Sequence, residues 1–91
     1  MNIDRLFEII QSRKQNMPAG SYTTSLFNDG LPRIAQKVGE EGTEVVVAAL
    51  VQEDQRLIEE VADLTYHTLV LLAARGLTPT HILAELEKRH K

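Results

Sequence analysis

Two apolar segments of this chain each carry a pair of carboxylates spaced three residues apart, and this pattern restricts the fold more than any other feature. Glu41 and Glu44 lie in the first segment, and Glu60 and Asp63 lie in the second. Residues three apart on an α-helix share a face, so each segment is predicted to be a helix with one acidic stripe. A turn near Gln52-Glu53-Asp54 would pair the helices antiparallel and set all four carboxylates at one level.

These clustered carboxylates require neutralisation. Two carboxylates about 5 Å apart repel each other by roughly 3 kcal/mol at an effective dielectric constant near 20. Solvated helix faces normally alternate acidic and basic residues, but no lysine lies between Lys37 and Lys88. We therefore interpret the four acids as protonated or bound to a cation, and we favour the cation.

Carboxylate oxygens are the ligands that hard cations prefer, so we predict that Mg²⁺, Mn²⁺ or Ca²⁺ binds here. A di-iron bundle would place a histidine three residues after a glutamate, whereas both i+3 partners in this pattern are acidic. Mg²⁺ is typically held together with substrate phosphates, so the acids indicate a phosphate ester or anhydride as substrate. The predicted metal ligands are Glu41, Glu44, Glu60 and Asp63.

Basic residues near the acids are candidates for binding such phosphates. The antiparallel pairing brings Lys37 opposite His67, and Arg33 precedes Lys37 by one turn. For His67, a structural imidazole hydrogen-bonded to a carboxylate is an equally good interpretation. Arg13 and Lys14 could add positive charge, although a surface role suits each basic residue taken alone.

Hydrophobic periodicity predicts an all-α fold with four helices in a single domain, residues 1–91. Apolar residues recur at helical spacing in each segment, and residues typical of helix N-termini precede them. The predicted helices are residues 3–16, residues 31–51 with Asp29 as N-cap, residues 54–75 with Asp54 as N-cap, and a last helix that starts at Pro79 after the N-cap Thr78.

Residues 17–30 form the one long stretch that is predicted to be irregular. Turn-forming residues dominate it, and a loop of this length in a small domain is usually functional or disordered. The hydroxyl groups of Ser21, Thr23 and Thr24 are suited to phosphate binding. A structural connector explains them equally well.

Both long helices carry apolar residues on two sides. Val46 and Leu50 lie opposite the acidic stripe of the first helix, and Ile58 lies on the far side of the second. Two short helices cannot cover all this surface, so we expect an oligomeric bundle. Gly39 and Gly42 each cost about 1 kcal/mol relative to alanine inside a helix, and close approach of a helix or ligand would explain them.

Composition excludes several classes of function. The chain has no cysteine, which rules out disulfide bridges and thiolate zinc sites. A net charge of −3 argues against a nucleic-acid-binding surface. The longest apolar run, Val45 to Val51, is far shorter than the roughly 20 residues of a membrane span, and the N-terminus is not a secretory signal. We therefore expect a cytoplasmic protein with no nucleic-acid or membrane partner.

The acidic pattern and its neighbours resemble a known enzyme family. The motif Glu40-Glu41-x-x-Glu44, followed after fifteen residues by Glu60-x-x-Asp63, is similar to the signature of the all-α nucleoside triphosphate pyrophosphatases, the MazG-like superfamily. The segments Ser21-Tyr22-Thr23 and Asp63-Leu64-x-Tyr66-His67 narrow the resemblance to the phosphoribosyl-ATP pyrophosphohydrolase family. The match extends over nearly the whole chain.

The resemblance implies a four-helix MazG-like fold, with a long antiparallel helix hairpin packed in a homodimer or higher homo-oligomer. It also implies Mg²⁺-dependent hydrolysis of phosphoribosyl-ATP to phosphoribosyl-AMP and pyrophosphate, the second step of histidine biosynthesis. A stand-alone form is expected, because the cyclohydrolase that is fused to this domain in some organisms would need more residues and metal-binding cysteines.

In the implied reaction, water attacks the α–β phosphoanhydride while a carboxylate orients or deprotonates it. Glu40, Glu41 and Glu44 are the catalytic candidates, and the identity of the base stays open. The candidate substrate-binding residues are Ser21, Tyr22, Thr23, Thr24, Arg33, Lys37 and His67. Two alternatives also fit the acids: a house-cleaning (d)NTP pyrophosphatase of the MazG type, and a non-enzymatic helical dimerisation or metal-binding module.

Overall fold

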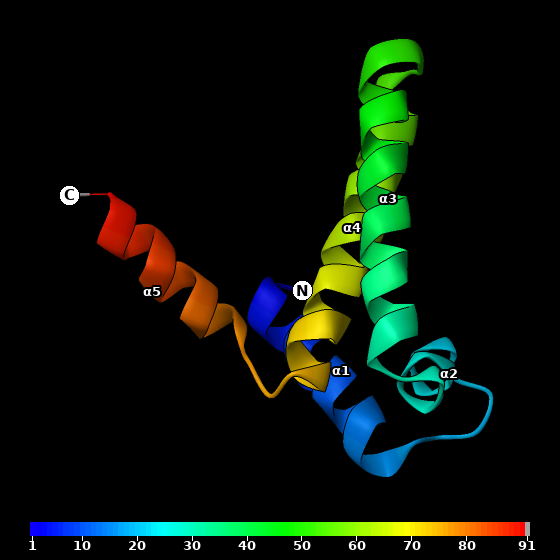
Figure 1. Ribbon diagram of the computed structural model, residues 1–91, viewed down its shortest axis with the longest axis vertical. Coiled ribbons are helices and arrows are strands. Elements are labelled where there is room, and N and C mark those ends of the chain that lie inside the picture. Colours follow the sequence, from blue (N-terminus) through cyan, green and yellow to red (C-terminus); the bar gives the residue numbers. More distant parts are fainter. Residues whose placement is uncertain (91) are drawn as a thin grey trace.

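The fold is a long helix hairpin with short helices at its base, described for residues 1–90 from a computed structural model. Helices α3 and α4 lie antiparallel, α1 and α2 pack at one end of them, and α5 projects away (Figure 1). The all-α prediction is confirmed, with five helices in place of four. The helices are α1 (Ile3–Asn16), α2 (Tyr22–Asp29), α3 (Leu31–Val51), α4 (Asp54–Ala74) and α5 (Pro79–Arg89).

The additional helix, α2, occupies most of residues 17–30, so the prediction of an irregular segment was wrong. Ser21 is its N-cap, because the backbone N–H of Thr24 donates to Ser21 Oγ at 3.3 Å. Gly20 and Gly30 flank the helix with φ angles of 80° and 92°, a conformation that favours glycine. The turn-forming residues therefore mark the two ends of a short helix, and its buried face holds it against the rest of the chain.

The bounds predicted for the two long helices agree with the structure, but their N-caps do not. The N-caps of α3 and α4 are Gly30 and Glu53. Asp29 is the last residue of α2, and Asp54 is the first helical residue of α4. An acidic residue in the first turn still interacts favourably with the helix dipole, so Asp54 suits its place without capping the helix.

Helix α5 begins where the sequence predicted. Thr78 is the N-cap, and its backbone N–H donates to Nδ1 of His81 at 3.0 Å. The side chain of Thr78 in turn accepts from the backbone of His81, and these two reciprocal contacts form a capping box. None of the residues of α5 is buried within this chain, so the helix is set by its cap and not by packing.

The hydrophobic core lies at the base of the hairpin, where α1 and α2 pack against α3 and α4. Lys14 Nζ donates to the carbonyl oxygen of Ala73 at 2.7 Å and ties α1 to the C-terminal end of α4. This bond gives Lys14 a structural role in place of the phosphate-binding role considered from the sequence. The buried core residues are Phe7, Ile10, Leu26, Ile34, Leu69, Val70 and Ala73.

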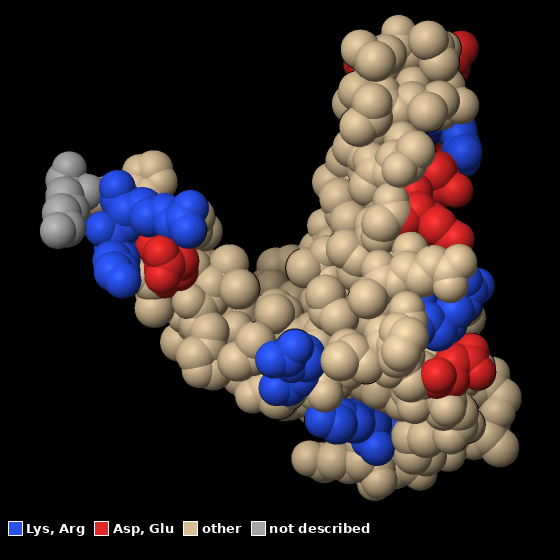
Figure 2. Space-filling model, in the orientation of Figure 1, with Lys and Arg blue, Asp and Glu red and all other residues tan. Residues whose placement is uncertain are grey.

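The rest of the hairpin leaves apolar side chains exposed. Val46, Leu50, Val51 and Ile58 are between 57% and 77% exposed. An open hollow of about 610 Å³ lies between α4, α5 and the start of α1, with Ile3, Leu64, Leu72, Ile82 and Leu83 among its lining residues. Figure 2 shows few charges on the side of the hairpin that faces α5, whereas acidic and basic side chains line the opposite edge. Within residues 1–90 no single helix combines the length and apolar composition of a membrane span; α4 and α5 meet these criteria only as a pair, bent by 104°.

The N-cap of α2 generates a prediction for stability. Replacing Ser21 with alanine removes the acceptor for the Thr24 N–H and for Arg13 Nη1, and loss of such a cap costs about 1 kcal/mol. We expect the thermal midpoint of Ser21→Ala to fall by about 4–8 °C, measured by circular dichroism. Ser25→Ala is the matched control, because the Ser25 hydroxyl donates to the Tyr22 carbonyl within the helix. Equal midpoints for the two variants would contradict the capping role.

Candidate metal centre

Three carboxylates from the two helices of the hairpin meet on its charged edge. Oxygen atoms of Glu41 on α3 and of Glu60 and Asp63 on α4 all lie within 4.8 Å of one another. Glu41 and Glu60 are buried, whereas Asp63 is exposed to solvent. The antiparallel pairing expected from the spacing of the acids therefore brings together three of the four predicted ligands, which we call the acidic triad.

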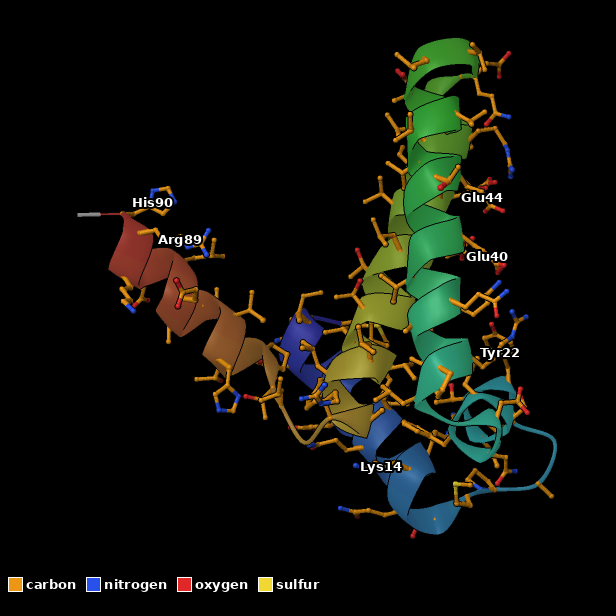
Figure 3. The ribbon with its side chains drawn as sticks, viewed as in Figure 1. Lys14, Tyr22, Glu40, Glu44, Arg89 and His90 are labelled. Carbon is orange, nitrogen blue, oxygen red and sulfur yellow. The ribbon has the colours of Figure 1, made fainter. Side chains whose placement is uncertain are left out.

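Glu44, the fourth predicted ligand, lies outside the acidic triad. Its side chain points outward from α3, as does that of Glu40 (Figure 3). Three residues advance a helix by about 4.5 Å along its axis, which carries Glu44 beyond Glu41 toward the 52–53 turn. There it lines a small cavity of about 240 Å³ together with Glu60 and Arg56. Its role as a metal ligand stays a prediction.

Each buried carboxylate of the acidic triad has one paired oxygen and one unpaired oxygen. Lys37 Nζ lies 3.2 Å from Glu41 Oε1, and Arg56 Nη2 lies 2.8 Å from Glu60 Oε1. Glu41 Oε2 and Glu60 Oε2 are buried without a hydrogen-bond donor among the described residues. A buried carboxylate oxygen without a partner is costly, and a divalent cation between the helices would satisfy both. The acidic triad therefore fits a hard divalent cation.

Lys37 flanks the acidic triad at the end nearer α2. Its hydrogen bond to Glu41 raises the pKa of Lys37, partial burial opposes this shift, and the negative charges of Glu41 and Glu40 add to it. Lys37 is therefore positively charged at neutral pH. Glu40 Oε1 lies 3.7 Å from both Lys37 Nζ and Arg33 Nη1, so the two predicted phosphate-binding bases share one exposed carboxylate in this structure.

His67 is buried and connects α4 to α2. Its Nδ1 lies 2.7 Å from the backbone oxygen of Asp63, which can only accept, so Nδ1 donates the proton. In the neutral ring, Nε2 then accepts from the hydroxyl of Tyr22 at 2.8 Å. The partner of His67 is thus a backbone carbonyl and not the carboxylate considered from the sequence. Lys37 and His67 were predicted to meet, but among the described residues Lys37 pairs with Glu40 and Glu41, whereas His67 bonds Tyr22 on α2.

The hydroxyl groups of residues 21–24 contact the protein itself. Ser21 caps α2, and the buried Thr23 is hydrogen-bonded to the hydroxyl of Tyr66. Thr24 is also buried, and its hydroxyl has no partner among the described residues. These contacts favour the structural interpretation of the hydroxyls, and phosphate binding by them stays a prediction. Tyr22, which is 53% exposed, is the member of the segment whose hydroxyl bonds His67 on α4.

Arg56 is the residue at this site that the sequence analysis missed. Its Nη1 lies 2.6 Å from Glu59 Oε1 and its Nη2 lies 2.8 Å from Glu60 Oε1. The hydrogen bond to Glu59 and the charges of both glutamates raise the pKa of Arg56. Arg56 precedes Glu60 by four residues, as Lys37 precedes Glu41, and a search for lysines alone overlooks this pair. The chain's own cations therefore neutralise part of the acidic charge.

Known proteins are similar to this chain over nearly its whole length, which includes the acidic triad. The model of the phosphoribosyl-ATP pyrophosphohydrolase family matches residues 3–90. The phosphoribosyl-ATP pyrophosphatase of Saccharolobus solfataricus is 51% identical over 89 residues, which are 98% of this chain and 95% of that protein. Proteins of the same name from Sulfolobus acidocaldarius and Saccharolobus islandicus are 51% and 48% identical, over 98% of this chain and 94% and 95% of their own lengths.

The unpaired oxygens of the acidic triad predict that a divalent cation stabilises the fold. At about 100 times its dissociation constant, a bound cation adds roughly 2.7 kcal/mol to the free energy of unfolding. We expect Mg²⁺ to raise the melting temperature of the unmodified protein and EDTA to reverse the change, measured by scanning fluorimetry. Glu41→Gln should abolish this response, whereas Glu8→Gln, which alters an exposed glutamate paired with Arg5, should keep it. A full Mg²⁺ response in Glu41→Gln would speak against the site.

Proposed function

The chain belongs to the phosphoribosyl-ATP pyrophosphohydrolase family, and we propose that it hydrolyses phosphoribosyl-ATP to phosphoribosyl-AMP and pyrophosphate in the biosynthesis of histidine. One observation carries the proposal beyond family membership. Two buried carboxylates on facing helices each keep an oxygen free beside a third carboxylate, which is the donor set for a cation that binds phosphates. We expect the reaction to take place in the cytoplasm, where ATP derivatives are formed.

We infer that the cation is Mg²⁺, with Mn²⁺ as a possible substitute, because the donors are carboxylate oxygens. Glu41, Glu60 and Asp63 would hold it, and Glu44, which lines a cavity together with Glu60, is a further candidate ligand. When bound, the cation would polarise the phosphoryl oxygens and offset the charge that develops on the leaving pyrophosphate. The remaining steps depend on the chain's own side chains.

Lys37 and Arg33 are the proposed phosphate-binding residues. Both are basic, both lie on α3 beside the acidic triad, and each is 3.7 Å from the same Glu40 oxygen. A polyphosphate carries more negative charge than one exposed carboxylate, so it can draw both bases away from Glu40. Tyr22, whose hydroxyl is fixed by the buried His67, would contact the substrate at the same end of the site.

Glu44 is the carboxylate that we propose as the base for the attacking water. It lies outside the acidic triad, at a cavity of about 240 Å³ that Glu60 also lines, so a water there could contact Glu44 while Lys37, Arg33 and a cation on the triad would hold the substrate. Glu40 lies instead within 3.7 Å of two basic side chains. We assign Glu40 the task of orienting these bases, and Glu41 that of a ligand.

We also propose that the enzyme is a homodimer or a higher homo-oligomer. The chain exposes 6269 Å² of surface, whereas a compact monomer of 10.2 kDa exposes about 5,300 Å². The excess of about 950 Å² is similar to the roughly 800 Å² that one partner buries in a standard interface. The radius of gyration of 14.2 Å likewise exceeds the value of about 12 Å for a compact domain of this length.

A stripe of small and apolar residues on α3 is the surface best suited to this association. A Cβ atom added to Gly39 or Gly42 would meet nothing within 4 Å, so the close approach expected at these glycines does not occur within the chain. A helix of a second copy would supply it, because small residues let two helix backbones come close. The stripe comprises Ala35, Gly39, Gly42, Val46 and Leu50.

Charge placed on this stripe should dissociate the oligomer. We expect Val46→Glu combined with Leu50→Glu to sediment as a single chain in analytical ultracentrifugation, whereas the unmodified protein sediments at a multiple of that mass. Both side chains are more than half exposed in the single chain, so the change costs the monomer little stability. Gln11→Glu on α1, at an exposed position, is the control for added charge. A monomeric unmodified protein would refute the proposed association.

The proposed activity is tested by release of pyrophosphate in the presence of Mg²⁺. We expect phosphoribosyl-ATP to be turned over in preference to ATP and dNTPs, and Glu60→Gln to lower kcat about 100-fold or more because charge stabilisation at the phosphates is lost. Glu85→Gln, which alters an exposed glutamate that also pairs with an arginine, should keep full activity.

Two other outcomes would replace the proposal. Preferential turnover of dNTPs would identify a house-cleaning pyrophosphatase of the MazG type. Absence of pyrophosphate release from any of these nucleotides would leave a non-enzymatic helical module. Retention of full activity by Glu60→Gln would remove the acidic triad from the mechanism.

A further inference from the structure

The two buried carboxylates of the acidic triad are paired in the same way but with different cations. Lys37 binds Glu41 Oε1 and Arg56 binds Glu60 Oε1, in each case from one turn earlier on the same helix. Because α3 and α4 are antiparallel, Lys37 approaches the triad from the α2 end and Arg56 approaches it from the 52–53 turn. The side chain of Lys37 is only 20% exposed, whereas that of Arg56 is 53% exposed. Water can therefore hydrate the guanidinium of Arg56 more readily than the ammonium of Lys37 when either leaves its carboxylate.

We propose that Arg56 is a positioning residue that acts through Glu60, as a counter-charge that the chain itself supplies. It neutralises the acidic triad while no metal is bound, and its charge weakens the binding of a divalent cation to the same carboxylate. This inference rests on the cation site of the proposed function. The proposed ligands increase the affinity of the site for the metal, whereas Arg56 decreases it.

The first half of the inference follows from the charges of the hairpin. Three carboxylates whose oxygens lie within 4.8 Å of one another repel strongly when two of them are buried. The guanidinium of Arg56 bridges two carboxylates, with one nitrogen on Glu60 and the other on Glu59. Removing this charge leaves Glu60 buried without a cation, which destabilises the metal-free hairpin.

The second half of the inference, that Arg56 weakens cation binding, follows from which oxygen of Glu60 it binds. Arg56 binds Oε1 of Glu60, and the unpaired oxygen is Oε2 of the same carboxylate. A divalent cation on Oε2 and a guanidinium on Oε1 are like charges on one group, so each weakens the binding of the other. Glu59 lies 2.6 Å from the other guanidinium nitrogen and is exposed. Arg56 can therefore move off Glu60 and still keep an ion pair.

This arrangement makes the hairpin less dependent on metal and makes tight metal binding dependent on substrate. The free enzyme keeps its acidic triad partly neutralised by its own side chains. A substrate polyphosphate then adds negative charge, which favours cation binding over the ion pair between Arg56 and Glu60. Cation and substrate are expected to bind cooperatively as a result.

Mn²⁺ binding to the full chain tests the inference, with free Mn²⁺ followed by electron paramagnetic resonance. We expect Arg56→Gln to bind Mn²⁺ about three- to tenfold more tightly than the unmodified protein, the effect being limited by the exposure of the guanidinium. Arg56→Lys keeps the charge and should bind with nearly the original affinity. Arg5→Gln makes the same change of net charge at an exposed arginine–glutamate pair on α1 and should leave the affinity unchanged.

A second readout separates this role from a purely structural one. Without metal, Arg56→Gln should melt at a lower temperature than the unmodified protein, and Mn²⁺ should raise its melting temperature by a larger increment. Glu59→Gln, which removes the alternative partner of Arg56, should bind Mn²⁺ more weakly than Glu8→Gln, which makes the same change of charge on α1. This variant tests the inference even if Arg56→Gln does not fold.

Each contrary result has a definite meaning. Unchanged or weaker Mn²⁺ binding by Arg56→Gln overturns the role of Arg56 and leaves the cation site in place. Equal tightening in Arg5→Gln also overturns it, because net charge alone would then explain the effect. If neither the unmodified protein nor any variant binds Mn²⁺, the proposed cation site and this inference fail together.

Discussion

The packing of α3 against α4 forces like charges together, and the rest of the site depends on how that repulsion is relieved. Glu41 and Glu60 are buried at the helix–helix contact and lie beside Asp63. Lys37 and Arg56 each pair with one oxygen of a buried carboxylate. The two buried oxygens that remain unpaired are suited to ligate a cation, so the repulsion that opposes packing of the hairpin arises from the same carboxylates that form the candidate metal centre.

The helix hairpin and the meeting of acidic residues from its two helices follow from the sequence, because residue spacing on a helix is fixed by backbone geometry. Spacing alone predicted that four carboxylates converge, and the structure brings together three of them, Glu41, Glu60 and Asp63. The outward displacement of Glu44 depends on side-chain direction and on the helix–helix contact, which spacing does not specify. Helix α2 depends on tertiary contacts such as that between Thr23 and Tyr66, and short helices are rarely determined by local sequence.

Helix α2 links the hydrophobic core to the charged edge of the hairpin. Its buried residue Leu26 belongs to the core, while Tyr22 reaches His67 and lies beside Lys37. A single short helix thus contributes both to the packing at the base of the hairpin and to the hydrogen bond that holds an exposed tyrosine against His67 on α4. Its N-cap, Ser21, matters to the site through this placement even if its hydroxyl never contacts a substrate.

The hairpin also has a consequence for how the chain reaches its native state. Helices α3 and α4 are joined by only Gln52 and Glu53, so the main tertiary contacts form between neighbouring parts of the sequence. Proteins of such low contact order fold within microseconds to milliseconds. The association that we propose is a bimolecular event, whose rate falls with dilution. In the proposed oligomer, encounter between folded chains, and not the folding of each chain, would limit how fast the assembly forms.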